Sequence, residues 1–344
     1  MGRCDHHAVL STCPGAPWSN VQIDNVCSLW KGYGHVYHIE ANDCDNVRRH
    51  VIIKHVDIPT TSASVESLSE DHVRKVHSYA VESVFYKELS ESMIQFGVNV
   101  PSKYHVEGEI GRQGGTMSIA MSDLQDLGPY YQRKANVLDM EEGKALLEWL
   151  ARFHAVNWKA APIEGGTMGL WNEGSFWQLG SRTTEFGQIE DDWRILHEIG
   201  EYVHEQLQHS SFRTVIHGDA KSANFFFYET GGGEERGLSI AGYDFQYCGF
   251  ADGMRDVAYV LCCSIRPDLV ERHEKTLLMH YHQALLAHLE QHHANEYTYD
   301  ELQKHFDLCV VDLARFMSGS RWWGNIDYIH RKTKEWISCH NSRI

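Results

Sequence analysis

The sequence predicts an α+β protein of two lobes, the first a small antiparallel sheet with one helix and the second mainly helical. Short apolar runs separated by turns follow one another from Val21 to Met121, as in a meander of strands. Apolar residues then recur at helical spacing from Asp139 to Trp158 and in most later segments. Between the later helices, two apolar runs flank a polar loop at His217–Asn224. We expect an N-terminal lobe over residues 1–124 and a C-terminal lobe over residues 125–344.

Length and composition fit such a globular protein. The 344 residues are enough for two lobes, and 42% hydrophobic with 23% charged residues is ordinary for a soluble chain. No apolar run approaches the length of a membrane span, and the polar N-terminus predicts no signal peptide. The nine cysteines are scattered and form no C-x-x-C pair. We therefore expect a cytoplasmic protein with no membrane partner and no zinc ribbon.

The charge balance restricts the partners. A formal net charge of -16 lacks the basic surface that a nucleic-acid backbone requires, so we expect no nucleic-acid partner. The same charge is compatible with a cationic substrate, which an acidic cleft would attract.

In the N-terminal lobe, three strands are expected at Val21–Lys31, His35–Ala41 and His50–Val56. The polar stretch Asp57–His77 predicts a mobile insertion that is partly helical. A helix is then expected over Ser78–Phe96, where apolar residues form a stripe.

Two further strands, Tyr104–Glu109 and Thr116–Met121, complete the expected sheet. The stretch S-D-L-Q-D-L-G, Ser122 to Gly128, ends before a proline and predicts a hinge between the lobes.

The C-terminal lobe should be built from amphipathic helices around an irregular segment. The irregular segment is the aromatic and glycine-rich stretch Gly165–Gln178. Helices are expected at Asp139–Trp158, Asp191–His209, Pro267–Gln291 and Tyr299–Met317.

The polar loop carries the chemistry. A strand at Thr214–Ile216 leads into it, and after a glycine turn at Gly231–Gly233 a further strand ends at Asp244. Asp219 and Asn224 are five residues apart, so that one can face an acceptor hydroxyl while the other faces a metal ion. The alternative is that these are turn residues that satisfy their own backbone.

The two motifs H-G-D-A-K-S-A-N and D-F-Q resemble the catalytic pattern of kinases. The glycine after the histidine, and the glutamine in place of the last glycine, resemble the aminoglycoside phosphotransferase and choline kinase superfamily, nearest its ecdysteroid-kinase-like branch. The resemblance implies a two-lobed protein-kinase-like fold. It also implies ATP-dependent transfer of the γ-phosphate to a hydroxyl of a small molecule, with Mg²⁺.

By this resemblance, each motif residue acquires a role. Asp219 would orient the acceptor hydroxyl and take its proton, and Lys221 would neutralise charge on the phosphoryl group. Asn224 and Asp244 would bind the metal. Asp256, in R-D-V-A, matches an aspartate that braces the backbone of the catalytic loop.

The resemblance also assigns a nucleotide site. Gly32 and Gly34 would approach the phosphates, although the position of a third glycine is Tyr37. Lys54 would pair with the phosphates and be held by a helix glutamate, Glu82, with Glu88 as the alternative. The remaining expected contacts, to adenine through backbone groups, come from Ser122 and Leu124.

Other features leave alternatives open. Trp322 and Trp323 either line an acceptor pocket or pack in the core. His288 and His292 have the spacing of a metal pair on a helix, but their polar surroundings favour a solvated face. His154 is expected to be a packed helix residue and not a base.

The incomplete glycine motif also permits a catalytically silent, kinase-like binding protein. A protein kinase is excluded, because no A-P-E segment follows D-F-Q. The sequence leaves the acceptor and the oligomeric state open.

Overall fold

The computed structural model describes residues 5–60, 68–133, 135–159, 169–231 and 237–340, which form two compact units. The first unit comprises residues 1–130 together with residues 241–246. The second comprises residues 131–240 and 247–344. The chain thus returns to the first unit for the six residues that contain the D-F-Q motif. The predicted division of roles between residues 1–124 and 125–344 stays a prediction.

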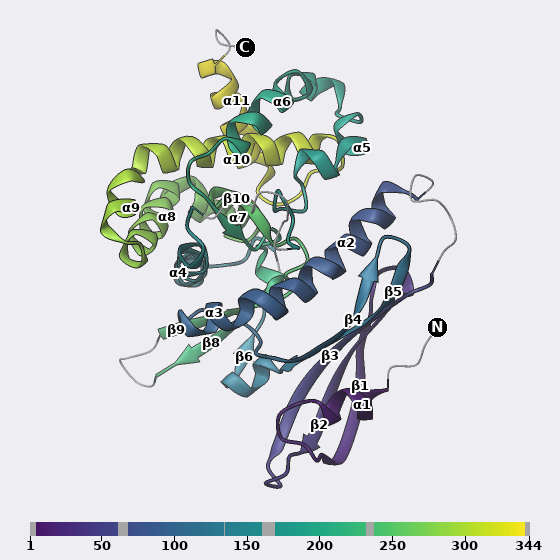
Figure 1. Cartoon of the computed structure of the whole chain (residues 1–344). Coiled ribbons are helices and arrows are strands. Elements are labelled where there is room, and N and C mark those ends of the chain that lie inside the picture. Colours follow the sequence, from purple (N-terminus) through teal and green to yellow (C-terminus); the bar gives the residue numbers. More distant parts are fainter. Residues whose placement is uncertain (1–4, 61–67, 134, 160–168, 232–236, 341–344) are drawn as a thin grey trace. The chain divides into compact units, whose positions relative to one another are not determined.

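The first unit is built on a five-stranded antiparallel sheet with the strand order β1-β2-β3-β5-β4 (Figure 1). Each expected strand of this region is present, with ends shifted by a few residues. The strands are β1 (Ser19–Ser28), β2 (Gly34–Asn42), β3 (Arg48–Ile58), β4 (Lys103–Gly111) and β5 (Gly114–Ser122).

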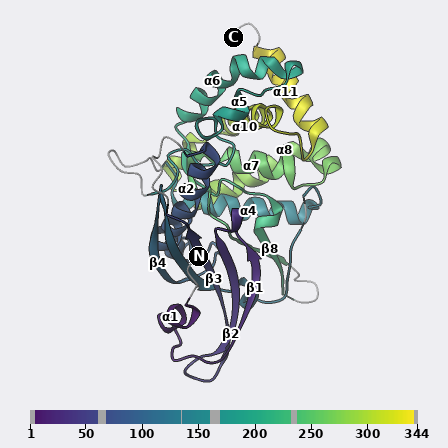
Figure 2. The ribbon, with the colours of Figure 1, turned by 90° about the vertical axis from the view of Figure 1, so that its right-hand side faces the viewer.

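Alternation along β3 divides its residues between the two faces of the sheet. Val51 and Ile53 are fully buried in a cluster with residues of the short helix α1 (His6–Ser11), which Figure 2 shows beside the strands. Lys54 lies on the opposite face, where it reaches the helix α2 (Glu70–Val84). The sheet therefore separates an apolar core from a face that carries a buried charge.

The helix of the first unit begins eight residues earlier than predicted. It runs from α2 through one π-helical turn (Phe85–Leu89) into α3 (Ser90–Gln95). The side chain of Ser69 accepts a hydrogen bond from the His72 N–H, and acidic residues fill the first turn. These are favourable N-terminal signals, and they place the helix start inside the predicted insertion. Residues 61–67 of that insertion lie outside the described residues.

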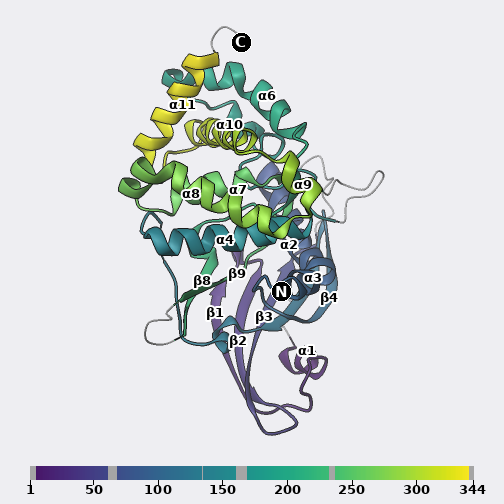
Figure 3. The same cartoon turned by 90° about the vertical axis from the view of Figure 1, so that its left-hand side faces the viewer.

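The second unit is mainly helical, as predicted. In Figure 3, α4, α8 and α10 follow one another in successive rows, and α10 packs against α6, α7 and α11. All ten residues of α7 are buried, including the charged pair Arg255 and Asp256, so this helix lies wholly within the interior of the unit. The helices are α4 (Met140–Val156), α5 (Thr183–Phe186), α6 (Arg194–Gln208), α7 (Met254–Cys263), α8 (Pro267–His288), α9 (Gln291–Glu296), α10 (Tyr299–Ser318) and α11 (Ile326–His340).

Short strands position the polar loop. β7 (Arg213–Ile216) pairs antiparallel with β10 (Gly249–Asp252), which the sequence analysis did not predict. β8 (Phe225–Thr230) is the middle strand of a small sheet, between β6 (Tyr130–Tyr131) and β9 (Gly237–Gly242). The loop His217–Asn224 therefore joins the end of β7 to the start of β8. The expected glycine turn extends beyond Gly231 into residues 232–236, which lie outside the described residues.

Within the described ranges, no helix is long and apolar enough to cross a membrane.

Candidate functional site

The loop between β7 and β8 gathers three of the predicted site residues around one carboxylate. Lys221 Nζ donates a hydrogen bond to Asp219 Oδ2 at 2.8 Å. Asn224 Nδ2 donates to the same oxygen at 3.1 Å and to the backbone oxygen of Asp219 at 2.9 Å. Asp219 and Asn224 are buried, whereas the Lys221 side chain is 41% exposed. The Asp219 carboxylate is thus held by the buried amide of Asn224 and contacted by the partly exposed ammonium group of Lys221.

Asp256, in the first turn of α7, holds the loop by its backbone. Its carboxylate accepts hydrogen bonds from the His217 N–H at 2.7 Å and from the Gly218 N–H at 2.9 Å. Asp256 is fully buried. The predicted bracing contact is confirmed, and the two residues before Asp219 have no freedom to shift independently of α7.

His154 supports the same carboxylate. Its Nε2 lies 3.2 Å from Asp256 Oδ2, and its Nδ1 lies 2.8 Å from the Tyr281 hydroxyl. A proton on Nε2 satisfies both contacts, since Asp256 accepts and the tyrosine hydroxyl donates. His154 is fully buried, so its predicted packing role is confirmed.

Gly218 explains why the loop reads H-G-D. Its φ is +80°, and a Cβ at this position would lie 2.0 Å from the backbone oxygen of Tyr247. Its own carbonyl accepts from the Phe176 N–H at 3.0 Å. Only glycine fits this approach of two chain segments, so the residue is required by packing.

In the first unit, Lys54 and Glu82 form a buried ion pair with an Nζ to Oε2 distance of 2.5 Å. Glu88, the alternative partner, is exposed. Asp244 Oδ1 lies 3.7 Å from the same Nζ. Burial alone lowers the pKa of Lys54, but attraction to Glu82 and Asp244 outweighs it and raises the pKa above its usual value. The two carboxylates thus favour the charged form of this lysine.

The D-F-Q segment is attached to α2 and the π-helical turn that follows. Phe245 stacks on Phe85 with ring centroids 3.6 Å apart, and Gln246 Oε1 accepts hydrogen bonds from Lys75 Nζ at 2.5 Å and from Ser78 Oγ at 3.3 Å. Asp244 has a φ of +68°, a conformation that aspartate tolerates better than most residues. The glutamine thus has a bonding role that a glycine could not fill. Sequence reasoning missed this tether, because no local pattern connects residues 75 and 246.

The glycine turn between β1 and β2 has a structural explanation at one of its two positions. Gly34, with a φ of +131°, pairs with Val56, and a Cβ there would lie 2.0 Å from the backbone oxygen of His55. Gly32, with a φ of +71°, has no atom within 4 Å of such a Cβ. Tyr37, at the expected third glycine, lies in β2 and packs against the apolar core. Sheet packing therefore accounts for Gly34, while Gly32 has open space in front of it.

The expected adenine contacts are restricted by the chain itself. The Ser122 N–H donates to the Ser102 carbonyl at 2.9 Å, and the Ser122 hydroxyl accepts from the Ser102 N–H at 2.9 Å. Leu124 is buried at the start of a short 3-10 helix that Asp123 caps. A role for Ser122 in nucleotide binding stays a prediction. Because its N–H is bonded to Ser102, the backbone contact would have to come from the Ser122 carbonyl.

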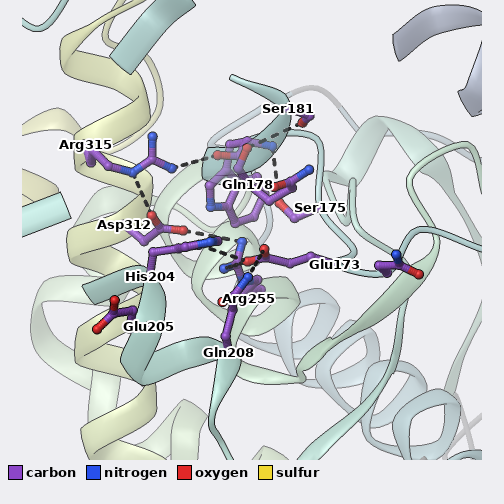
Figure 4. Close-up of polar contacts among 12 residues, drawn as sticks. Glu173, Ser175, Gln178, Ser181, His204, Glu205, Gln208, Arg255, Asp312 and Arg315 are labelled. Carbon is purple, nitrogen blue, oxygen red and sulfur yellow. Dashed lines mark hydrogen bonds and ion pairs between the residues drawn. The ribbon is translucent and has the colours of Figure 1, made fainter. Parts of the chain in front are cut away.

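An ion network surrounds the buried side chain of Arg255, the neighbour of Asp256 in α7 (Figure 4). Arg255 pairs with Glu173 and, at 3.4 Å, with Asp312, which in turn accepts from Arg315 Nε at 2.8 Å. Burial raises the pKa of Glu173, but Arg255, followed by hydrogen bonds from His204 and Gln208, outweighs this and lowers it to about 2. Sequence reasoning missed the network, since Glu173 stands in the segment read only as irregular.

The possible metal pair of histidines and the two tryptophans considered for an acceptor pocket lie in different surroundings in the second unit. His288 ends α8 and His292 lies in α9, so the two do not share one helix. Trp322 packs against Trp193 and His330. Trp323 is half-buried, and its ring packs against those of Phe176 and Phe316.

The predicted site residues therefore form two clusters, one in each unit. Lys54, Glu82 and Asp244 meet in the first unit, and Asp219, Lys221 and Asn224 meet in the second. The assignment of a chemical role to each residue remains a prediction.

Comparisons with known proteins bear on the family resemblance and on the fold. Residues 178–294, which include the Asp219 loop and D-F-Q, match the model of the ecdysteroid kinase-like family. The resemblance predicted from the sequence is confirmed. A search of curated proteins finds no match to the chain.

Two solved structures are similar to the chain. The microcompartment-associated aminopropanol kinase is 13% identical, with a TM-score of 0.52 over 97% of each chain. The GDP and kanamycin complex of APH(2")-IIia is 13% identical, with a TM-score of 0.46 over 95% of this chain and 97% of that one. The first likeness shows the fold: the chain has the predicted α+β protein-kinase-like fold.

Replacing Gly34 with alanine should destabilise the protein far more than replacing Gly32. The Gly34→Ala variant combines backbone strain with a collision against the His55 carbonyl, for a loss on the order of 3 kcal/mol. Gly32→Ala meets only the strain of a positive φ, about 1 kcal/mol. Urea unfolding of both variants measures the difference. Equal losses would contradict the packing role of Gly34.

The Glu173 carboxylate should contribute a pH-dependent part of the stability. Because the folded pKa is depressed from 4.5 to about 2, the contribution is complete above pH 4.5 and is lost as the pH falls toward 2. The shift corresponds to at most about 3 kcal/mol. Urea unfolding across this window should show a shallower pH dependence for Glu173→Gln. The exposed neighbour variant Glu205→Gln should keep the wild-type slope, and an identical slope in Glu173→Gln would refute the assignment.

Proposed function

We propose that this protein is an ATP-dependent phosphotransferase that moves the γ-phosphate to a hydroxyl group of a small molecule. The observation that carries the proposal is the buried cation of Lys54, held at 2.5 Å by Glu82 with Asp244 at 3.7 Å. A charged lysine with a fixed position is suited to pair with nucleotide phosphates. A buried ion pair such as that of Lys54 and Glu82 is weak evidence for a role in stability, so a functional role is the better explanation.

The proposed metal ligands are chemically suited to Mg²⁺. Asn224 donates through its amide nitrogen, which leaves Oδ1 as the ligand atom, and Asp244 offers carboxylate oxygens. Magnesium prefers such oxygen donors and, when bound, would neutralise charge on the phosphates.

Asp219 is the proposed catalytic residue. Two hydrogen bonds from Asn224 fix its orientation, so one oxygen can face an acceptor hydroxyl, position it and take its proton. Lys221 would turn from Asp219 toward the transferred phosphoryl group, which its partly exposed side chain allows. In this proposal, Lys54 and Lys221 stabilise charge that is spread over the phosphoryl oxygens.

The acceptor is proposed only as a small-molecule alcohol in the cytoplasm. The net charge of -16 supports a cationic alcohol, while the aromatic surroundings of Trp323 suit either a quaternary ammonium or a flat apolar alcohol.

A catalytically silent binding protein is the second candidate. Two observations favour it: the third glycine position carries the core residue Tyr37, and sheet packing accounts for Gly34. Both candidates would bind nucleotide or a small ligand, so binding and turnover have to be measured separately.

Nucleotide binding should require Mg²⁺ and Asp244 together. We expect ATP with Mg²⁺ to raise the melting temperature of the wild type by about 2 °C or more at saturating nucleotide. Asp244→Ala should abolish the rise, because a proposed metal ligand is lost. Asp192→Asn, at an exposed aspartate of the second unit, is the matched control and should shift like the wild type. A wild-type shift in Asp244→Ala would remove Asp244 from the site.

Turnover should require Asp219 when binding does not. Transfer of labelled γ-phosphate is measured with amino alcohols, aminoglycosides, sterols and sugars as acceptors. For any acceptor that is phosphorylated, Asp219→Asn should lower kcat about 100-fold or more while keeping the ATP-dependent thermal shift. A protein that shifts with ATP but transfers phosphate to none of these acceptors would support the silent binding protein.

A further inference from the structure

Three potential metal ligands lie together on one face of the first unit's sheet. His38 and Glu40 are two residues apart on β2, so they point to the same face, and Glu40 lies opposite His50 on β3. One ligand atom from each of the three lies within 4.8 Å of the other two. His50 also lies on the same face as Lys54, four residues along the same strand. A search of the described residues for three histidine, cysteine or acidic side chains with ligand atoms this close together finds His38, Glu40 and His50.

A carboxylate stands behind each histidine. His50 Nδ1 lies 2.7 Å from Asp126 Oδ1, and His38 Nε2 lies 3.2 Å from Asp123 Oδ2. Metal-binding histidines characteristically place one ring nitrogen on the metal and the other on a carboxylate, which fixes the orientation of the ring. A single histidine and carboxylate pair is common in proteins, but two such pairs converging beside a third carboxylate form an ordered ligand set.

The contact between His38 and Asp123 is enclosed by the protein. His38 Nε2 and Asp123 Oδ2 are both buried, and they lie 3.2 Å apart. A buried carboxylate oxygen needs a donor, so Nε2 is the ring nitrogen that should carry the proton. A metal ion on the other nitrogen of His38 would keep the proton on Nε2 and orient it toward Asp123.

We propose that His38, Glu40 and His50 form a binding site for a divalent transition metal of the zinc class, separate from the proposed magnesium ligands. Imidazole nitrogens with one carboxylate are the ligands that such ions prefer, and three protein ligands leave a fourth position for water. Glu40 also accepts from Arg48 at 2.8 Å through one oxygen, which leaves the other for the metal.

The local charge agrees with a divalent ion. Glu40, Asp123 and Asp126 bring three carboxylates to the cluster, and Arg48 brings one guanidinium. A doubly charged cation balances this set. The His38 and Asp123 side chains are 16% and 5% exposed, so charge at this end of the cluster is screened less than at an exposed surface.

The test is a calorimetric titration of the full chain with Zn²⁺ alone. Nucleotide is left out, because phosphates bind zinc themselves. We expect one equivalent to bind with micromolar affinity or better, and we expect His50→Gln and Glu40→Gln each to weaken binding at least tenfold. The double variant His288→Gln/His292→Gln, at exposed histidines outside the cluster, should bind like the wild type. Absence of wild-type binding, or equal binding in all variants, would overturn the proposal.

Cobalt spectroscopy on the wild type keeps the test decisive if a variant fails to fold. Co²⁺ in a four-coordinate site with histidine ligands gives visible absorption bands that the hydrated ion lacks, and Zn²⁺ should abolish them stoichiometrically. Asp126→Asn should keep the bands and weaken metal binding about tenfold, since Asp126 only orients His50. A Co²⁺ spectrum identical to that of the hydrated ion would refute the site.

Discussion

The arrangement of the second unit depends on one buried carboxylate, that of Asp256. It accepts hydrogen bonds from two successive backbone N–H groups of the loop and contacts His154, which itself contacts Tyr281. The loop and α4 therefore both contact this one side chain of α7, and α8 is joined to it through His154. A carboxylate without access to water is stable only with such partners, so the loop cannot move away without leaving a buried charge unsatisfied. The rigidity of the loop near Asp219 is a consequence of this penalty.

Arg255, the residue before Asp256 in α7, belongs to a second buried network. Arg255 pairs with Glu173 and Asp312 while Asp256 faces the loop. Because consecutive helix residues point in directions about 100° apart, the pair at 255 and 256 serves two different surroundings. The segment that contains Glu173 also supplies Phe176, whose N–H donates to the Gly218 carbonyl. The loop is thus held from two sides, by α7 directly and through the Glu173 segment.

Local patterns predicted the elements well, whereas contacts between distant segments could not be predicted from them. The alternation of apolar residues located all five strands of the first unit, and helical periodicity located α4, α6, α8 and α10. Both motifs identified residues that do cluster, such as Asp219 with Asn224. The early start of α2 was missed because its first residues are polar and its capping residue, Ser69, stands in a serine-rich stretch. The strand β10 was missed because its four buried residues include a glycine and an aspartate, whose role in pairing arises only from the fold.

The grouping of D-F-Q with the first unit is the clearest limit of sequence reasoning. The motif follows β9 in the chain, and the sequence alone assigns it to the C-terminal lobe. Its actual place is decided by the stacking of Phe245 on Phe85 and by the bonds of Gln246 to Lys75 and Ser78. These are partners separated by about half of the chain, and their contact energy has no local signature. The π-helical turn takes part in the same contact, because Phe85 is its first residue.

The two lysines of the candidate site are held with very different strengths, and this difference suits their proposed roles. Lys54 is buried, paired at 2.5 Å and kept charged by its two carboxylates, so releasing it would leave an uncompensated charge in the interior. Lys221 is 41% exposed, and an ion pair of that exposure is worth about 1 kcal/mol or less. In the proposed reaction, exchanging Asp219 for a phosphoryl group would therefore cost Lys221 little, while the bond from Asn224 to Oδ2 keeps the Asp219 carboxylate in place. Under the proposed function, a cation that must be present before the nucleotide binds is expected to be held as Lys54 is, and one that follows charge as it moves is expected to be held as Lys221 is.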